Sequence, residues 1–113
     1  MPKVVFRVKL SLVRESTDTP FFASLPAIEN AKAEWTLAGK ILNHYGEISE
    51  DGLTRTYVID FPTKTLKDEF AGTPASREGI RGLLNYNSLN KITTYFDEKD
   101  VITNDYDWSY DFI

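Results

Sequence analysis

Residues 41–61, which read ILNHYGEISEDGLTRTYVIDF, form the stretch of sequence that decides the fold. Leu53 to Phe61 alternates between two sets of side chains, and this period of two is typical of a β-strand with one buried face. Ile41 to Ile48 predicts a weaker strand, because polar residues and a glycine interrupt it. Asp51-Gly52 is typical of a tight turn between antiparallel strands. Together these features predict an antiparallel β-hairpin.

A strand and a helix are predicted before the hairpin. From Lys3 to Arg14 apolar and polar residues alternate, with Val4, Phe6, Val8, Leu10 and Leu12 on one face. Ser24 is the predicted N-cap of a helix that stops at Gly39, because glycine is common at the position just after a helix. The expected apolar stripe of this helix consists of Leu25, Ile28, Ala31, Trp35 and Ala38, and the residues expected outside it are Glu29, Lys32 and Glu34.

A broken helix and a final strand are predicted after the hairpin. Thr65, with Asp68 three residues later, predicts a first helix start, and Gly72-Thr73-Pro74 breaks that helix. Thr73 is the predicted N-cap of a second helix with Pro74 in its first turn. Lys91 to Asp97 alternates again and predicts the last strand.

The element order predicts an α+β fold of the ferredoxin-like type, β-α-β-β-α-β, with an antiparallel sheet and an additional C-terminal strand or extended tail. Right-handed crossovers place the helices on one face of this sheet. The other face is expected to present Val5, Arg7, Lys9, Thr56, Val58 and Tyr95. This mixture is too apolar for a purely solvated surface, so we expect a second subunit or the C-terminal tail to cover it.

This layout resembles the dimeric α+β barrel proteins of the ferredoxin-like fold, including the antibiotic-biosynthesis-monooxygenase-like and YCII-like families. The resemblance rests on the element order over residues 3–97, on the stretch Ala38-Gly39-Lys40-Ile41-Leu42 and on the Asp51-Gly52 turn. It implies homodimers whose sheets pack face to face, some of which bind small aromatic or haem-like ligands. No family motif matches residue by residue, so the resemblance assigns no catalytic residue.

Length and composition set further limits. The 113 residues fit a single domain, which we divide into a core over 1–97 and an acidic, aromatic extension over 98–113. The chain has no cysteine, which excludes disulfides and zinc–thiolate sites, and it has only one histidine. We therefore expect no metal and no cofactor. The net charge of −4 argues against nucleic-acid binding, and no apolar run is long enough for a membrane span. We expect a soluble, cytoplasmic protein.

The only candidate for proton chemistry is His44, the one side chain whose ordinary pKa lies near neutrality. Trp35 and Tyr57 are expected within its reach, and the three side chains could line a small pocket for an aromatic ligand. A single histidine without a partner acid or nucleophile has no triad chemistry. The favoured interpretation is a surface histidine or one at a dimer seam.

The end of the chain carries four aromatic residues at alternate positions: Tyr106, Trp108, Tyr110 and Phe112. In an extended strand they share one side, and acidic tails without structure are poor in aromatics. We therefore predict that Val101 to Ile113 is ordered and covers the open sheet face or a partner subunit. Asp105, Asp107 and Ser109 resemble the start of a calcium loop, but the glycine and glutamate that such a loop needs are missing.

Two classes of function remain, and the first is favoured. In the first, the chain is a homodimeric binding or accessory module without catalysis. In the second, it is a cofactor-independent, monooxygenase-like enzyme that acts on a small aromatic ligand. A small phage-encoded structural or accessory protein of similar topology is a further alternative.

Overall fold

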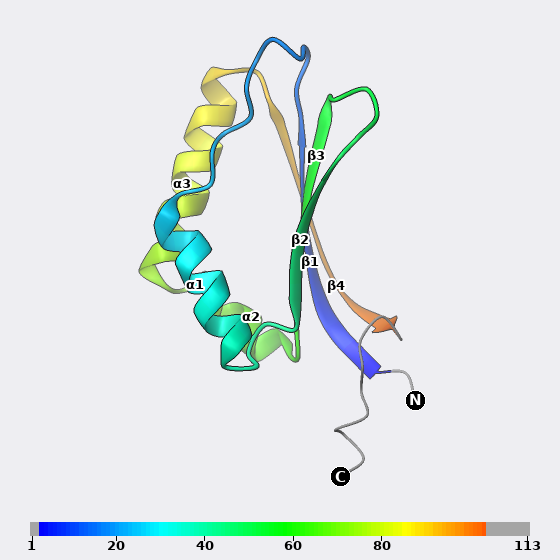
Figure 1. The fold of residues 1–113 in the computed structure, drawn as a ribbon, viewed down its shortest axis with the longest axis vertical. Coiled ribbons are helices and arrows are strands. Elements are labelled where there is room, and N and C mark those ends of the chain that lie inside the picture. Colours follow the sequence, from blue (N-terminus) through cyan, green and yellow to red (C-terminus); the bar gives the residue numbers. More distant parts are fainter. Residues whose placement is uncertain (1–2, 104–113) are drawn as a thin grey trace.

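Residues 3–103 form a four-stranded antiparallel sheet and three helices (Figure 1). The computed structural model describes residues 3–103. In chain order the elements are β1 (Lys3–Val13), α1 (Pro26–Leu37), β2 (Asn43–Ile48), β3 (Thr54–Phe61), α2 (Lys64–Ala71), α3 (Pro74–Leu89) and β4 (Thr93–Thr103).

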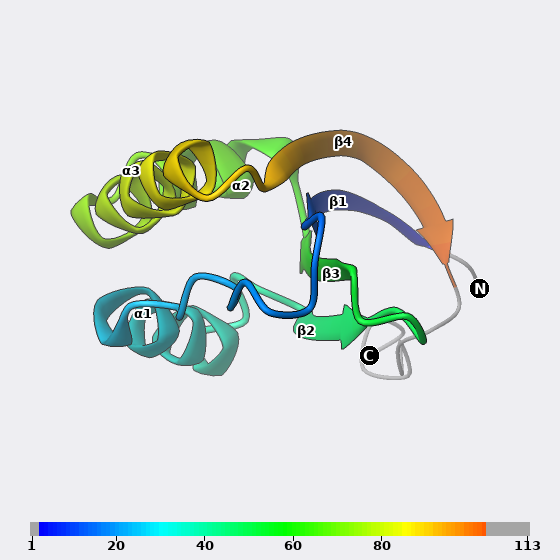
Figure 2. The same cartoon turned by 90° about the horizontal axis from the view of Figure 1, so that it is seen from above.

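The strand order across the sheet is β2-β3-β1-β4, and every neighbouring pair is antiparallel. Viewed from above, all three helices lie on the same side of the sheet (Figure 2). This is the ferredoxin-like arrangement, so the predicted fold class is confirmed. The broken helix is also confirmed, because α2 and α3 are separated by Gly72 and Thr73.

The strand register decides which side chains face the helices. Phe6 of β1 lies opposite Phe61 of β3, and Leu10 lies opposite both Tyr57 and Phe96. Paired residues of antiparallel strands point to the same face, so the apolar set of β1 faces the helices. Buried residues on this side form two clusters: Phe6, Ile41, Phe61 and Phe70 in one, and Leu12, Leu83 and Ile92 in the other.

The opposite face of the sheet is not covered by any helix of residues 3–103 (Figure 2). Arg7 donates two hydrogen bonds to the fully buried carboxylate of Asp60, at 2.8 and 2.9 Å. Such a bidentate pair satisfies a carboxylate that burial would otherwise destabilise. Tyr45 and Tyr95 remain 39% and 57% exposed on this face. We call this surface the open face.

The helix starts differ in part from the sequence predictions. Leu25, not Ser24, is the N-cap residue of α1, because a residue before proline favours the extended backbone that this position needs. The prediction for Ser24 was therefore wrong. The start predicted at Thr65 was also wrong, since Thr63 is extended and its Oγ1 accepts a hydrogen bond from the Leu66 N–H. Thr73 caps α3 as predicted.

The last strand runs further than its side-chain pattern indicates. β4 continues six residues beyond Asp97 to Thr103, where it pairs with Lys3. The backbone of β1 offers pairing along its whole length, which outweighs the run of charged side chains over 97–100. The division at 97/98 thus falls inside β4. Tyr106, Trp108, Tyr110 and Phe112 lie outside the described residues, as do Asp105, Asp107 and Ser109.

Candidate functional site

A cavity of about 200 Å³ lies between the sheet and the three helices. Each of these helices and three of the strands contribute to its mostly apolar wall, for example through Val8, Ile28, Ile59, Phe70, Ile80 and Phe96. An engineered apolar cavity of about 150 Å³ is known to bind benzene. The cavity is therefore large enough for a molecule with a single ring.

Small residues on two helices leave this space open. Ala71 of α2 and Ser76 and Gly79 of α3 line the cavity at positions where larger side chains would fill it. Members of both buried clusters also line it, with Phe61 from one and Leu83 from the other. The cavity thus interrupts the apolar contact between helices and sheet.

Lys32 of α1 is a charged residue in the cavity wall, with only 11% of its side chain exposed. Its Nζ lies 2.9 Å from Oε1 of Glu29 and 5.8 Å from the ring centre of Tyr57. The prediction that Lys32 lies outside the helix stripe was wrong. Lys32 is four residues after Ile28 and three before Trp35, so helical spacing places it on the same side as both.

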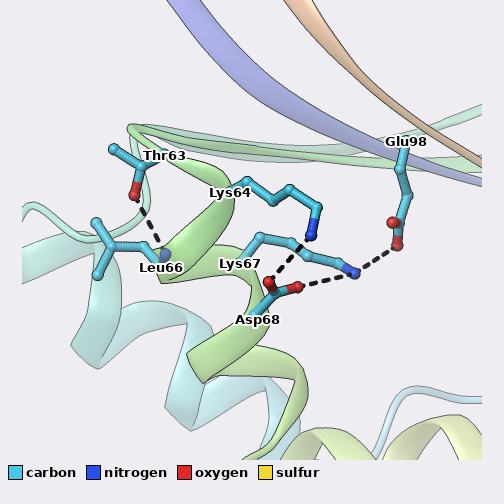
Figure 3. Close-up of polar contacts among 6 residues, drawn as sticks. All are labelled: Thr63, Lys64, Leu66, Lys67, Asp68 and Glu98. Carbon is cyan, nitrogen blue, oxygen red and sulfur yellow. Dashed lines mark hydrogen bonds and ion pairs between the residues drawn. The ribbon is translucent and has the colours of Figure 1, made fainter.

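Lys67 of α2 is the second lysine in the cavity wall, with 17% of its side chain exposed. Its Nζ lies 2.8 Å from Oε1 of Glu98 on β4 and 3.6 Å from Oδ1 of Asp68 (Figure 3). The neighbouring Lys64 also pairs with Asp68, but it does not line the cavity and its side chain is 66% exposed. The Lys67–Glu98 pair connects α2 to the sheet beside the cavity.

The acid beside Lys32 remains ionised. Burial alone would raise the pKa of Glu29, but hydrogen bonds from Ser24 and Lys32 and the charge of Lys32 bring this pKa below its ordinary value. Glu29 is 45% exposed and does not line the cavity. Among residues 3–103, the charged members of the cavity wall are Lys32, Lys67 and Glu98. The wall therefore carries a formal charge of +1 when all three are ionised.

Of the three residues predicted for a pocket, Tyr57 lines the cavity. Trp35 is packed into the core edge-on against Phe70, with 5.0 Å between ring centroids. His44 of β2 lies opposite Ile59, on the helix side of the sheet, but is not part of the cavity wall. Burial and the charge of Lys32 lower the pKa of His44, and Glu29 partly offsets them. The residues that the sequence analysis missed are Lys32 and Lys67.

The arrangement suits binding by apolar contact and by charge. Over residues 3–103, no cluster of three or more histidine or acidic side chains is placed to hold a metal ion. No helix in this part of the chain is long and apolar enough to cross a membrane.

Neither a family model nor a curated protein matches this sequence. Protein SO0527 from Shewanella oneidensis has a similar solved structure, with a TM-score of 0.56 and 10% identity over 90% of this chain and 98% of that one. A dimeric ferredoxin-like protein from an uncultured marine organism gives a TM-score of 0.47, with 9% identity over 91% of this chain and 97% of that one. Rv0793 from Mycobacterium tuberculosis gives 0.42, with 14% identity over 89% and 97%. The first likeness shows a shared fold alone, and the two weaker ones add nothing to it.

Proposed function

We propose that the protein is a binding module for a small, mainly apolar molecule, which occupies the cavity between the helices and the sheet. The observation that carries this proposal is the combination of an apolar cavity of about 200 Å³ with two largely buried lysines in its wall. Ligand sites in proteins are typically apolar hollows with a few polar groups that fix orientation.

The size of the cavity sets the expected affinity. A single-ring molecule that buries about 150 Å² of apolar surface gains roughly 4 kcal/mol at about 25 cal/mol per Å². Loss of translational and rotational freedom offsets part of this gain. We therefore expect simple probes to bind no more tightly than about 1 mM, and a ligand that also uses the polar groups to bind more tightly.

Calorimetric titration with phenylethanol, a neutral single-ring probe, tests the proposal. Ser76→Leu adds a large side chain to the cavity wall and should weaken binding by about tenfold or more. Ser88→Leu is the matched control, because Ser88 is exposed on the same helix, and it should leave binding unchanged. Absence of binding to the unmodified protein, or equal binding to Ser76→Leu, would contradict the proposal.

An enzyme that uses the same cavity is a second candidate, because two residues with proton-transferring side chains, Tyr57 and Lys32, line it. Incubating the probe with the protein in air and analysing it by mass spectrometry separates the two functions. An unchanged probe supports a binding module. Oxidised probe that forms only with the protein, and not with Ser76→Leu, would favour the enzyme.

We also propose that the protein is a homodimer joined through the open face. Tyr45 and Tyr95 expose aromatic rings there, beside the charged Lys9 and Asp97. Protein–protein interfaces are typically rich in aromatic residues at the centre and polar at the rim. A cavity on the opposite side of the sheet is left accessible by this arrangement.

A further inference from the structure

We propose that the ligand is a small carboxylic acid with an apolar body, and that Lys32 binds its carboxylate. This inference rests on the proposed function, since it assigns the chemical class of the molecule that occupies the cavity. It is carried by the position of the charged groups around the cavity, by their exposure and by the hydrogen-bonding capacity of the two lysines.

Both lysines belong to the cavity wall, whereas two of their three acidic partners do not. Lys32 and Lys67 line the cavity with 11% and 17% of their side chains exposed. Glu29 and Asp68, at 45% and 54% exposure, are not part of the wall. Water screens exposed charges more strongly than buried ones. Glu98 in the wall offsets Lys67, so the excess positive charge of the cavity wall comes from Lys32, and it favours an anion over a cation.

Lys32 has more unused hydrogen-bonding capacity than Lys67. An ammonium group carries three N–H donors. Among the described residues Lys32 forms one ion pair, to Glu29, whereas Lys67 contacts two carboxylates, those of Glu98 and Asp68. Glu98 itself lines the cavity and balances Lys67. A ligand carboxylate can bond to Lys32 without displacing Glu29, and this makes Lys32 the anchor.

Stability alone does not require an ammonium group at this position. An ion pair with a half-exposed partner contributes little net stability, and water can solvate the Glu29 carboxylate, which is 45% exposed, when the ammonium is removed. Methionine has a similar length and would fill the same space beside Tyr57. Lys32→Met should therefore fold, and this makes it a suitable variant for the test.

Three probes of one shape distinguish the ligand classes: phenylacetate, phenylethanol and phenethylamine. Each is titrated calorimetrically into the unmodified protein and into Lys32→Met, Lys67→Met and Lys64→Met. Lys64→Met is the control for the loss of one positive charge, because Lys64 is exposed on α2 outside the cavity wall. We expect phenylacetate to bind about tenfold tighter than phenylethanol, and phenethylamine to bind most weakly. Lys32→Met should weaken phenylacetate binding about tenfold and leave the affinity for phenylethanol unchanged.

Each other outcome overturns a stated part of the account. If phenylethanol or phenethylamine binds as tightly as phenylacetate, the assignment of the ligand as a carboxylic acid is wrong, while the cavity remains a binding site. If Lys67→Met or Lys64→Met weakens phenylacetate as much as Lys32→Met does, Lys32 is not the anchor. If none of the three probes binds, the proposed function itself fails, and the ligand class fails with it.

Discussion

His44 shows how one side chain can make stability depend on pH. Burial and the charge of Lys32 lower its pKa in the folded protein below the ordinary 6.5, despite the opposing effect of Glu29. The unfolded chain therefore binds a proton more readily. The fold is most stable above the unfolded pKa and loses stability as the pH falls from about 6.5 towards the lowered folded value.

We predict that His44→Gln loses less stability than the unmodified protein as the pH falls. Urea unfolding at about pH 7.5 and about pH 5.5 should give a smaller difference in midpoint for His44→Gln than for the unmodified protein. Asn43→Gln, at the exposed neighbouring position, is the control and should keep the full difference. Equal losses in all three proteins would show that His44 does not carry this pH dependence.

Single residues also show where sequence analysis of the site stops. The sequence predicts Tyr57 as a pocket residue within reach of His44, and strand periodicity is enough to place it on the helix side of the sheet. The same reasoning places Lys32 outside the apolar stripe of its helix. Its spacing from Ile28 and Trp35 places it inward, but only the packed structure shows that its stem is buried and its ammonium paired.

Among the elements, the junction between α2 and α3 depends on Thr73. Its Oγ1 accepts a hydrogen bond from the Ser76 N–H at 3.3 Å and donates one to the Phe70 carbonyl at 2.7 Å. We predict that Thr73→Ala lowers the free energy of unfolding by about 1 kcal/mol, the usual cost of losing an N-cap. Thr65→Ala, at an exposed position inside α2, should change it by less than about 0.5 kcal/mol. Equal effects in chemical denaturation would count against this capping role.

The elements themselves could largely be predicted from local patterns. The alternation in β1 and β3, the Asp51-Gly52 turn and the break before Pro74 each depend on residues close together in the chain. Gly39 and Gly52 both adopt the left-handed backbone that these patterns require, with φ of 74°. The length of β4 could not be predicted in this way, because pairing with β1 sustains it beyond its own alternating pattern.

At the scale of the whole molecule, the open face and the C-terminal segment belong to one prediction. β4 ends at Thr103, and the aromatic residues Tyr106, Trp108, Tyr110 and Phe112 follow it. If these residues reach across the open face to a partner subunit, a chain that ends at Thr103 loses an anchor of considerable apolar area. We predict that light scattering finds a dimer for the full chain and a monomer for the shortened one, with a lower melting temperature. A shortened chain that keeps the dimer mass and the melting temperature of the full chain would contradict the prediction.

The central claim is that the cavity between the helices and the sheet is the ligand site, and amide NMR tests it most directly. Phenylacetate is titrated into labelled protein, and shift changes are mapped onto the fold. We predict that the changes cluster at the cavity wall, around Lys32, Tyr57 and Ser76, while Lys9 and Tyr95 on the open face stay unchanged. Saturable changes confined to the open face, or no saturable changes at all, would contradict the claim.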